Sequence, residues 1–113
     1  AYAGRVKTFA FGENPLPGVT ALDASGHTPG HTAFETDALL IIGDLLHAAA
    51  IQIPRPEVSS TYDVDPAKAA ATRLRLYERA AASGKPVAGM HLPYPGLGRI
   101  VKEASGFRYV PNP

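Results

Sequence analysis

The sequence predicts a small α/β domain in which a mixed, mainly antiparallel sheet packs against one long helix. Eleven glycines and eleven prolines divide the 113 residues into short segments, which favours short strands joined by tight turns over a helical bundle. Several of these segments are rich in β-branched and apolar residues, as is typical of strands. One long alanine-rich segment, residues 66–83, has the length and the flanking residues of a helix.

The clearest strand signal is a hairpin in the first half of the chain. Residues 31–35 and 39–42 flank Thr36 and Asp37, which suit a turn, and the second strand is apolar on both faces. Residues 45–51 are apolar enough for either a short helix or a buried loop. Further strands are expected at residues 6–11, 19–24 and 86–90, and as a closing hairpin at 99–103 and 107–110.

The long helix has recognisable ends. Asp65 suits the N-cap and Pro66 the first helical position, and Gly84 after Ser83 is typical of a C-terminal cap. The helix is therefore expected at about residues 65–83. The stripe expected to face the core consists of Ala70, Leu74, Tyr77 and Ala81, and the side chains expected mostly on other faces are Arg73, Arg75, Glu78 and Arg79.

Composition excludes several classes of protein. A content of 45% hydrophobic and 19% charged residues indicates one globular unit, and the net charge of +1 without a basic block argues against a nucleic-acid partner. The longest purely apolar run, residues 38–42, is far shorter than the roughly 20 residues of a membrane span. We expect a soluble protein, of the cytoplasm or the periplasm. Since the chain has no cysteine, a metal would bind to histidine and carboxylate.

Two histidines lie in the segment Gly26-His27-Thr28-Pro29-Gly30-His31. The proline and the glycines exclude a helix, so the helical His-x-x-x-His geometry of zinc sites does not apply. A stiff loop between two strands can nevertheless hold a metal ligand at a sheet edge. The alternative is a turn whose histidines bond only to backbone, which is the more frequent case for an isolated motif of this kind.

Two further candidates follow predicted strands. Asp44 comes after the apolar run 39–43, and His91 comes after the strand predicted at 86–90. Strand ends are where open α/β sheets hold their ligands. Alternatively, Asp44 caps its own turn, and His91 is a structural histidine in a segment stiffened by Pro93 and Pro95.

In combination and in this order, the motifs resemble the second half of the metallo-β-lactamase superfamily. GHTPGH, GDLLHAAAIQ, the helix after Asp65-Pro66, HLPYPGLGRI and GFRYVPNP have the look and order of its methyl parathion hydrolase-like group. The resemblance implies half of an αββα sandwich, with residues 1–113 as a C-terminal half. The His-x-His-x-Asp-His motif of the family's N-terminal half does not occur in these residues.

The resemblance also implies the roles of individual residues. His31 would bind one metal, Asp44 would bridge two metals as the catalytic carboxylate, and His91 would bind the other metal. We expect His27 to orient the loop or the carboxylate. His47 follows Asp44 by three residues and could face the site, but such a residue is more often an ordinary partly buried histidine, and it is not counted among the catalytic residues. The implied cofactors are two divalent ions, zinc by default, with manganese, cobalt or iron also suited to these ligands. In the 113-residue chain we expect this site to be incomplete.

The implied activity is that of a binuclear metal-dependent hydrolase, in which a metal-bound hydroxide attacks an ester, lactone or phosphotriester. Segments 48–62 and 92–97 are apolar enough to wall a pocket for a neutral small molecule, although Ile51 and Ile53 would equally suit packing beneath the loop. The isolated chain is expected to be inactive, and to pair with the missing half or a second copy because half a sandwich exposes an apolar sheet face. The alternative function is a non-catalytic half-domain that acts only by such assembly.

Overall fold

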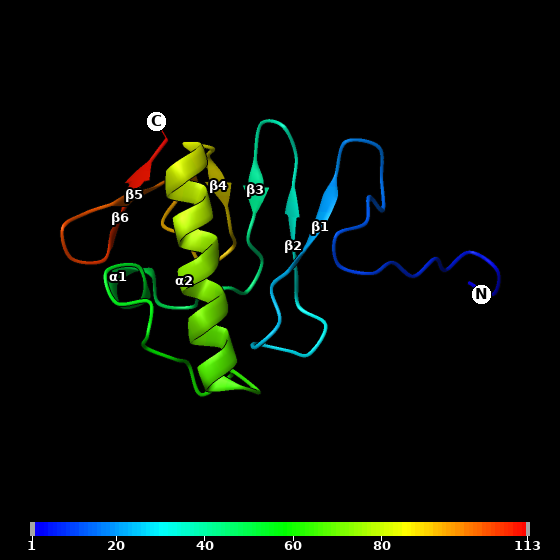
Figure 1. The fold of residues 1–113 in the computed structure, drawn as a ribbon, viewed down its shortest axis with the longest axis horizontal. Helices are drawn as coiled ribbons and strands as arrows, with labels where there is room; N and C mark the ends of the chain where they lie inside the picture. Colours follow the sequence, from blue (N-terminus) through cyan, green and yellow to red (C-terminus); the bar gives the residue numbers. More distant parts are fainter. Residues whose placement is uncertain (1, 113) are drawn as a thin grey trace.

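A six-stranded sheet organises the chain, for which the computed structural model describes residues 2–112 (Figure 1). The strands lie side by side in chain order, and only β3 and β4 pair in parallel. A parallel pair needs a crossover connection, and here the crossover contains both helices. The elements are β1 (Thr20–Asp23), β2 (Thr32–Glu35), β3 (Leu40–Ile41), α1 (Ala49–Gln52), α2 (Pro66–Ser83), β4 (Val87–Ala88), β5 (Leu97–Lys102) and β6 (Phe107–Pro111). The predicted fold class is confirmed.

Both hairpins predicted from the sequence are confirmed. β2 pairs with β3 in antiparallel fashion, with Glu35 opposite Leu40. The hydroxyl of Thr36 accepts hydrogen bonds from the backbone N–H groups of Ala38 and Leu39, which closes the turn. β5 and β6 form the closing hairpin. The segment whose structure the sequence left open is a loop up to Ala48, followed by the short helix α1.

The ends of α2 are those that the sequence predicts. The side chain of Asp65 accepts a hydrogen bond from the N–H of Lys68, and Pro66 is the first helical residue. Gly84 ends the helix in the left-handed conformation, with φ +65°, and its N–H donates to the carbonyl of Ala80. These local signals determine the ends because they satisfy backbone groups that have no partner inside the helix.

The buried face of α2 differs from the prediction. Leu74 is 45% exposed, whereas Arg73, expected mostly outside, is completely buried. An alanine-rich helix offers apolar residues on every side, so the periodicity of its sequence does not determine which side packs on the sheet. The buried residues of the helix are Ala69, Thr72, Arg73, Leu76, Tyr77 and Ala80.

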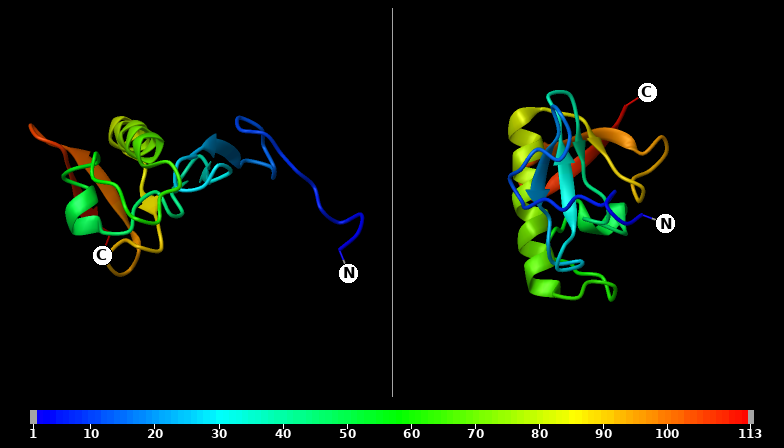
Figure 2. Two further views of the ribbon diagram at one scale, coloured as in Figure 1. Left: turned by 90° about the horizontal axis from the view of Figure 1, so that it is seen from below. Right: turned by 90° about the vertical axis from the view of Figure 1, so that its right-hand side faces the viewer.

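The core lies between α2 and the sheet. α2 lies over one face of the sheet. The short helix α1 lies apart from α2, beside the β5–β6 hairpin (Figures 1 and 2). The central strands and the loop after β3 supply most of the apolar side chains. The core contains Leu40, Ile42, Leu45, Leu46, Ile53, Leu76, Tyr77, Val87, Ile100 and Phe107.

The prediction of a strand at residues 6–11 is wrong. This segment runs away from the sheet as an extended arm (Figure 2), and Val6 is 74% exposed. The outer edge of β1 is instead bonded by the next residues: the N–H of Gly12 donates to the carbonyl of Ala21, and the N–H of Ala21 donates to the carbonyl of Glu13. A segment of high β-propensity forms a strand only where the edge of a sheet is free to pair with it.

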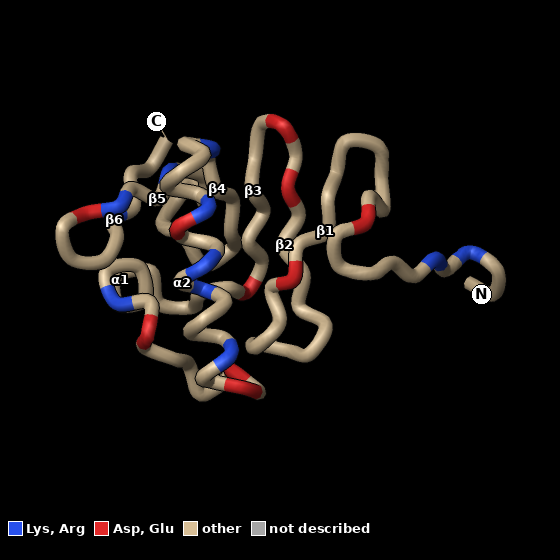
Figure 3. The backbone as a smooth tube through the Cα atoms, in the orientation of Figure 1, with Lys and Arg blue, Asp and Glu red and all other residues tan. Residues whose placement is uncertain are grey.

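Charged residues of both signs are mixed along the chain. α2 carries mainly Lys and Arg together with Glu78, and the β5–β6 hairpin carries residues of both signs, so no long block of one sign forms (Figure 3). Within residues 2–112, neither helix combines the length and the apolar character that crossing a bilayer requires.

An ion pair between β2 and α2 predicts a pH-dependent contribution to stability. The guanidinium of Arg79 binds Glu35 through two hydrogen bonds of 3.1 and 2.5 Å, and this contact lowers the pKa of Glu35 below its ordinary value of 4.5. The ionised carboxylate therefore stabilises the fold above about pH 4.5, and this contribution disappears as the pH falls through the lowered pKa. Glu35→Gln should reduce the free energy of unfolding by about 1 kcal/mol at pH 7 and by less in acid.

Urea unfolding of both proteins at several pH values measures this difference. The control is Glu57→Gln, which alters an exposed glutamate with no ion pair among the described residues. A loss that stays constant from pH 7 into the acid range would contradict the assignment.

Candidate metal centre

Histidine and aspartate side chains from four loops meet at one edge of the sheet. Asp44 follows β3 and His91 follows β4, and since these strands are parallel their carboxyl ends lie at the same edge. β1 runs in the same direction as β3, because both are antiparallel to β2, so His27 reaches this edge as well. His47 and Asp63 come from the crossover between β3 and β4.

The imidazole rings of four histidines form a continuous row. The ring of His27 lies 5.7 Å from that of His31 and 4.8 Å from that of His47, between ring centroids. The ring of His47 lies 4.8 Å from that of His91. Within this row two groups place their donor atoms within 4.8 Å of one another: His27, His47 and Asp63, and Asp44, His47 and His91.

The carboxylate of Asp44 lies between two of the histidines. Its Oδ1 atom is 3.3 Å from Nε2 of His91, and its Oδ2 atom is 3.9 Å from Nε2 of His27. The side chain is 36% exposed, so it is accessible from solvent. Two of the three ligands expected from the sequence, Asp44 and His91, are therefore adjacent.

His31, the third expected ligand, bonds to backbone through both ring nitrogens. Nδ1 lies 2.9 Å from the carbonyl oxygen of Ala24, and Nε2 accepts a hydrogen bond from the N–H of Asp44 at 3.0 Å. Since a carbonyl only accepts, the ring proton is on Nδ1. In this arrangement His31 joins the end of β1 to the turn that carries Asp44, and a metal could bind to its Nε2 only in place of the Asp44 N–H.

The turn before Asp44 requires glycine for two reasons. Gly43 has φ +53°, which disfavours a side chain. A Cβ atom at this position would also lie 2.7 Å from Nε2 of His31. The glycine of the Gly-Asp pair therefore allows the imidazole to approach the backbone of Asp44.

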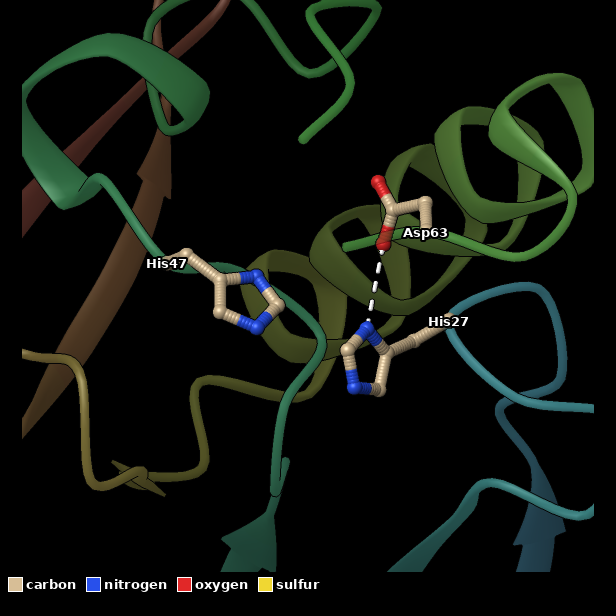
Figure 4. Close-up of side chains that lie close together, drawn as sticks. All are labelled: His27, His47 and Asp63. Atoms are coloured by element: carbon tan, nitrogen blue, oxygen red, sulfur yellow. Dashed lines mark hydrogen bonds and ion pairs between the residues drawn. The ribbon is translucent and has the colours of Figure 1, made fainter. Parts of the chain in front are cut away.

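His27 faces two carboxylates, and one of them was not foreseen from the sequence. Its Nδ1 is 3.3 Å from Oδ1 of Asp63 (Figure 4), while its Nε2 is directed toward Asp44. Asp63 lies in a polar loop just before the helix N-cap, where an aspartate is an ordinary turn residue. Nothing in its spacing connects it with a histidine 36 residues earlier in the chain.

His47, which the sequence did not place among the catalytic residues, lies at the centre of the cluster. It belongs to both groups of donor atoms, and its buried Nδ1 has no hydrogen-bond partner among the described residues. Burial lowers the pKa of His47 below its ordinary value of 6.5, and the neighbouring His27 and His91 lower it further against the opposing effect of Asp44 and Asp63. The ring is thus kept neutral, the form that binds metals. Its spacing of three residues from Asp44 was the available signal.

The donor set fits divalent metal ions. Neutral imidazoles and carboxylates are the ligands that zinc and related divalent metals take in the absence of thiolates. The unpartnered Nδ1 of His47 and the close approach of donor atoms in both groups are what such a site needs.

Comparison with solved structures identifies similar folds. A structure of the hydrolase AbOPH, described as a member of the beta lactamase superfamily, matches with a TM-score of 0.90 and 33% identity over 98% of this chain and 40% of its own. AidC is a dizinc quorum-quenching lactonase in complex with a product, N-hexanoyl-L-homoserine. It matches with a TM-score of 0.87 and 29% identity over 95% of this chain and 38% of its own length. A probable metal-dependent hydrolase from Staphylococcus aureus has the same fold, with a TM-score of 0.78 and 17% identity over 98% of this chain and 41% of its own length.

The neighbours are hydrolases of the metallo-β-lactamase superfamily, and this chain spans about 40% of their length. The α/β structure matches half of that fold, as the sequence predicts. Comparisons of the sequence with family models and with curated proteins found no match.

Replacement of Gly43 tests the contact between His31 and the turn of Asp44. Gly43→Ala places a methyl group against the His31 ring, whereas the control Gly84→Ala changes a glycine that also has positive φ but has open space around it. We expect Gly84→Ala to cost about 1 kcal/mol for its backbone conformation, and Gly43→Ala to cost at least about 1 kcal/mol more. Urea unfolding measures both, and equal costs would contradict the constraint on His31.

Proposed function

We propose that the chain is the C-terminal half of a binuclear metal-dependent hydrolase of the metallo-β-lactamase superfamily, of the methyl parathion hydrolase-like type. The observation that carries the proposal is the convergence of Asp44, His47 and His91 with His27 and Asp63 at one sheet edge. The hydrolase neighbours with the same fold support it. Further ligands would come from a His-x-His-x-Asp-His segment, which these 113 residues do not contain.

Within this proposal, Asp44 and His91 would hold the metal ions, with the carboxylate of Asp44 shared between two of them. The geometry supports these roles because the two carboxylate oxygens of Asp44 face different histidines. For the ligand from the 26–31 loop, the geometry favours His27 over His31. The Nε2 atom of His27 faces the carboxylate, whereas both nitrogens of His31 are engaged with backbone. His31 then acts by holding the turn of Asp44.

Divalent ions at this site, zinc by default, would supply Lewis-acid activation of water and of the substrate's carbonyl or phosphoryl oxygen. The chain's own residues keep the donors in place. His31 holds the backbone of Asp44, and Gln52 accepts hydrogen bonds from the N–H groups of His47 and Ala48. The neutral ring of His47 separates His27 from His91 without adding positive charge.

The surroundings of the cluster favour a neutral, fairly apolar substrate such as an ester, lactone or phosphotriester. The ring of Tyr62 lies 5.6 Å from that of His47, and Tyr62, Met90 and Ile51 are all exposed. Ile53 packs in the core instead, so only Ile51 of the two isoleucines is available to line a pocket. The product bound by AidC, an acylated homoserine, is of a class that such a surface would accept.

We propose that the chain acts together with a missing half or a second copy, and that it is inactive alone. Ile41 and Val101 are exposed on the strand positions that alternate with the buried Leu40 and Ile100, so the sheet face opposite α2 carries apolar side chains that a second layer would cover. The alternative of a purely non-catalytic half-domain is not favoured, because the neighbours are hydrolases and the donor atoms remain assembled.

Zinc binding provides the first test. We expect the 113-residue chain to bind Zn²⁺ weakly, since part of the ligand set is lacking. Asp44→Asn should lower the affinity by more than about tenfold, because even loss of a group outside the coordination sphere costs about 10–100-fold. Isothermal titration calorimetry measures both affinities, with Asp37→Asn in the exposed β2–β3 turn as the control. An affinity unchanged by Asp44→Asn would contradict the assignment.

Hydrolysis by the complete protein that carries this chain provides the second test. Turnover of an aryl ester, a lactone and an aryl phosphotriester should exceed that of an anionic β-lactam, when compared by kcat/KM, and a chelator should abolish it. The 113-residue chain with added Zn²⁺ or Mn²⁺ should show no turnover. Preference for the β-lactam would overturn the apolar pocket and leave the metal assignment intact, whereas robust turnover by the 113-residue chain would overturn its proposed inactivity.

A further inference from the structure

Asp63 is a fully buried carboxylate whose two oxygens have different partners. Its side chain is 0% exposed. Oδ2 accepts a hydrogen bond from the N–H of Ser60 at 2.9 Å and from Nη2 of Arg73 at 3.4 Å. Oδ1 faces Nδ1 of His27 at 3.3 Å (Figure 4). A carboxylate held by a guanidinium and a backbone N–H acts as a hydrogen-bond acceptor.

The guanidinium of Arg73 is itself anchored, so Asp63 cannot easily change position. Nε donates to the carbonyl of Leu45 at 2.8 Å, and Nη1 donates to the carbonyls of Pro56 and Val58 at 2.8 and 2.9 Å. Arg73 is completely buried on α2. The helix thus fixes the carboxylate relative to the loop that follows β3.

The loop of Asp63 is also tied to the loop of His27 through backbone. The N–H of Val64 donates to the carbonyl of His27 at 3.1 Å, and the N–H of Asp65 donates to the carbonyl of Gly26 at 2.9 Å. A Cβ atom on Gly26 would lie 2.4 Å from the backbone nitrogen of Ala69, so the first turn of α2 packs directly against this loop. The approach of Asp63 to His27 is therefore imposed by the backbone as well as by the side chains.

We propose that Asp63, held by Arg73, is a positioning residue that keeps the ring proton of His27 on Nδ1 and so directs the lone pair of Nε2 toward Asp44. As an acceptor, Oδ1 of Asp63 needs a donor, which requires hydrogen on Nδ1 of His27. Nε2 then has no proton, and it makes no hydrogen bond among the described residues. This inference rests on the proposed function, in which that lone pair binds a metal, and it adds the residue that prepares the ligand.

The neighbouring His31 provides an internal reference. The carbonyl of Ala24 keeps its ring proton on Nδ1, so both loop histidines have the same tautomer for separate reasons. Loss of the Asp63 carboxylate should alter His27 alone.

Long-range ¹H–¹⁵N NMR of the metal-free 113-residue chain tests the proposal directly, at about pH 8, above the ordinary pKa of about 6.5 of a histidine side chain. We expect both His27 and His31 in the Nδ1–H form. In Asp63→Asn the amide can donate to Nδ1 as readily as accept, so His27 should shift toward the Nε2–H form while His31 remains unchanged. In the same Asp63→Asn variant the zinc affinity, measured by calorimetry, should fall about 10–100-fold. Asp63→Glu should restore part of the Nδ1–H form of His27 and part of the zinc affinity.

The matched control is Glu35→Gln, which removes another carboxylate paired with an arginine of α2 at a distance from the histidines. It should leave the tautomer of His27 and the zinc affinity unchanged. His27 in the Nε2–H form in the unmodified chain would overturn the proposal even if Asp63→Asn fails to fold, and so would unchanged zinc affinity in Asp63→Asn. A different result would contradict the proposed function itself, namely zinc binding that Asp44→Asn leaves unchanged.

Discussion

The buried guanidinium of Arg73 is the interaction on which the histidine and aspartate cluster depends. A single side chain on α2 binds carbonyls from the loop after β3 and from the segment that leads to the helix, and it also holds the carboxylate of Asp63. Burying this cation is tolerable because polar groups surround it. Without it, the carbonyls and the carboxylate would be left buried without a donor. The loops carrying His47 and Asp63 would then lose their common anchor.

The sheet supplies the complementary constraint. Only one pair of neighbouring strands is parallel, and this pair places Asp44 and His91 at the same edge although half the domain separates them in sequence. The crossover that such a pair requires brings His47 and Asp63 to that edge on the way. One topological feature therefore explains why donors from four separate loops meet, and why α2, which packs across the sheet, can control their positions.

Two histidines in one loop have different environments despite equivalent chemistry. His31 is enclosed by the backbone of Ala24 and Asp44, so its lone pair is already used. His27 faces a carboxylate on each side, so one nitrogen is held while the other points into the cluster. The division follows from what surrounds each Nε2 atom, an N–H group in one case and a carboxylate beyond hydrogen-bonding distance in the other. This division suits a site in which His31 positions the carboxylate of Asp44 and His27 offers a free ring nitrogen beside that carboxylate.

The sequence by itself determined the features that depend on nearby residues: the caps of α2 at Asp65 and Gly84, the two hairpins, and the prediction of Asp44 and His91 as residues at strand ends. Only the tertiary structure decided which face of α2 is buried, since alanine lies on all sides of it, and that Val6 and its neighbours have no edge to pair with. It also decided the contacts of Arg73, Asp63, His27 and His31. Their partners lie many residues away, and local patterns contain no information about which distant carbonyl or carboxylate will face a given ring nitrogen.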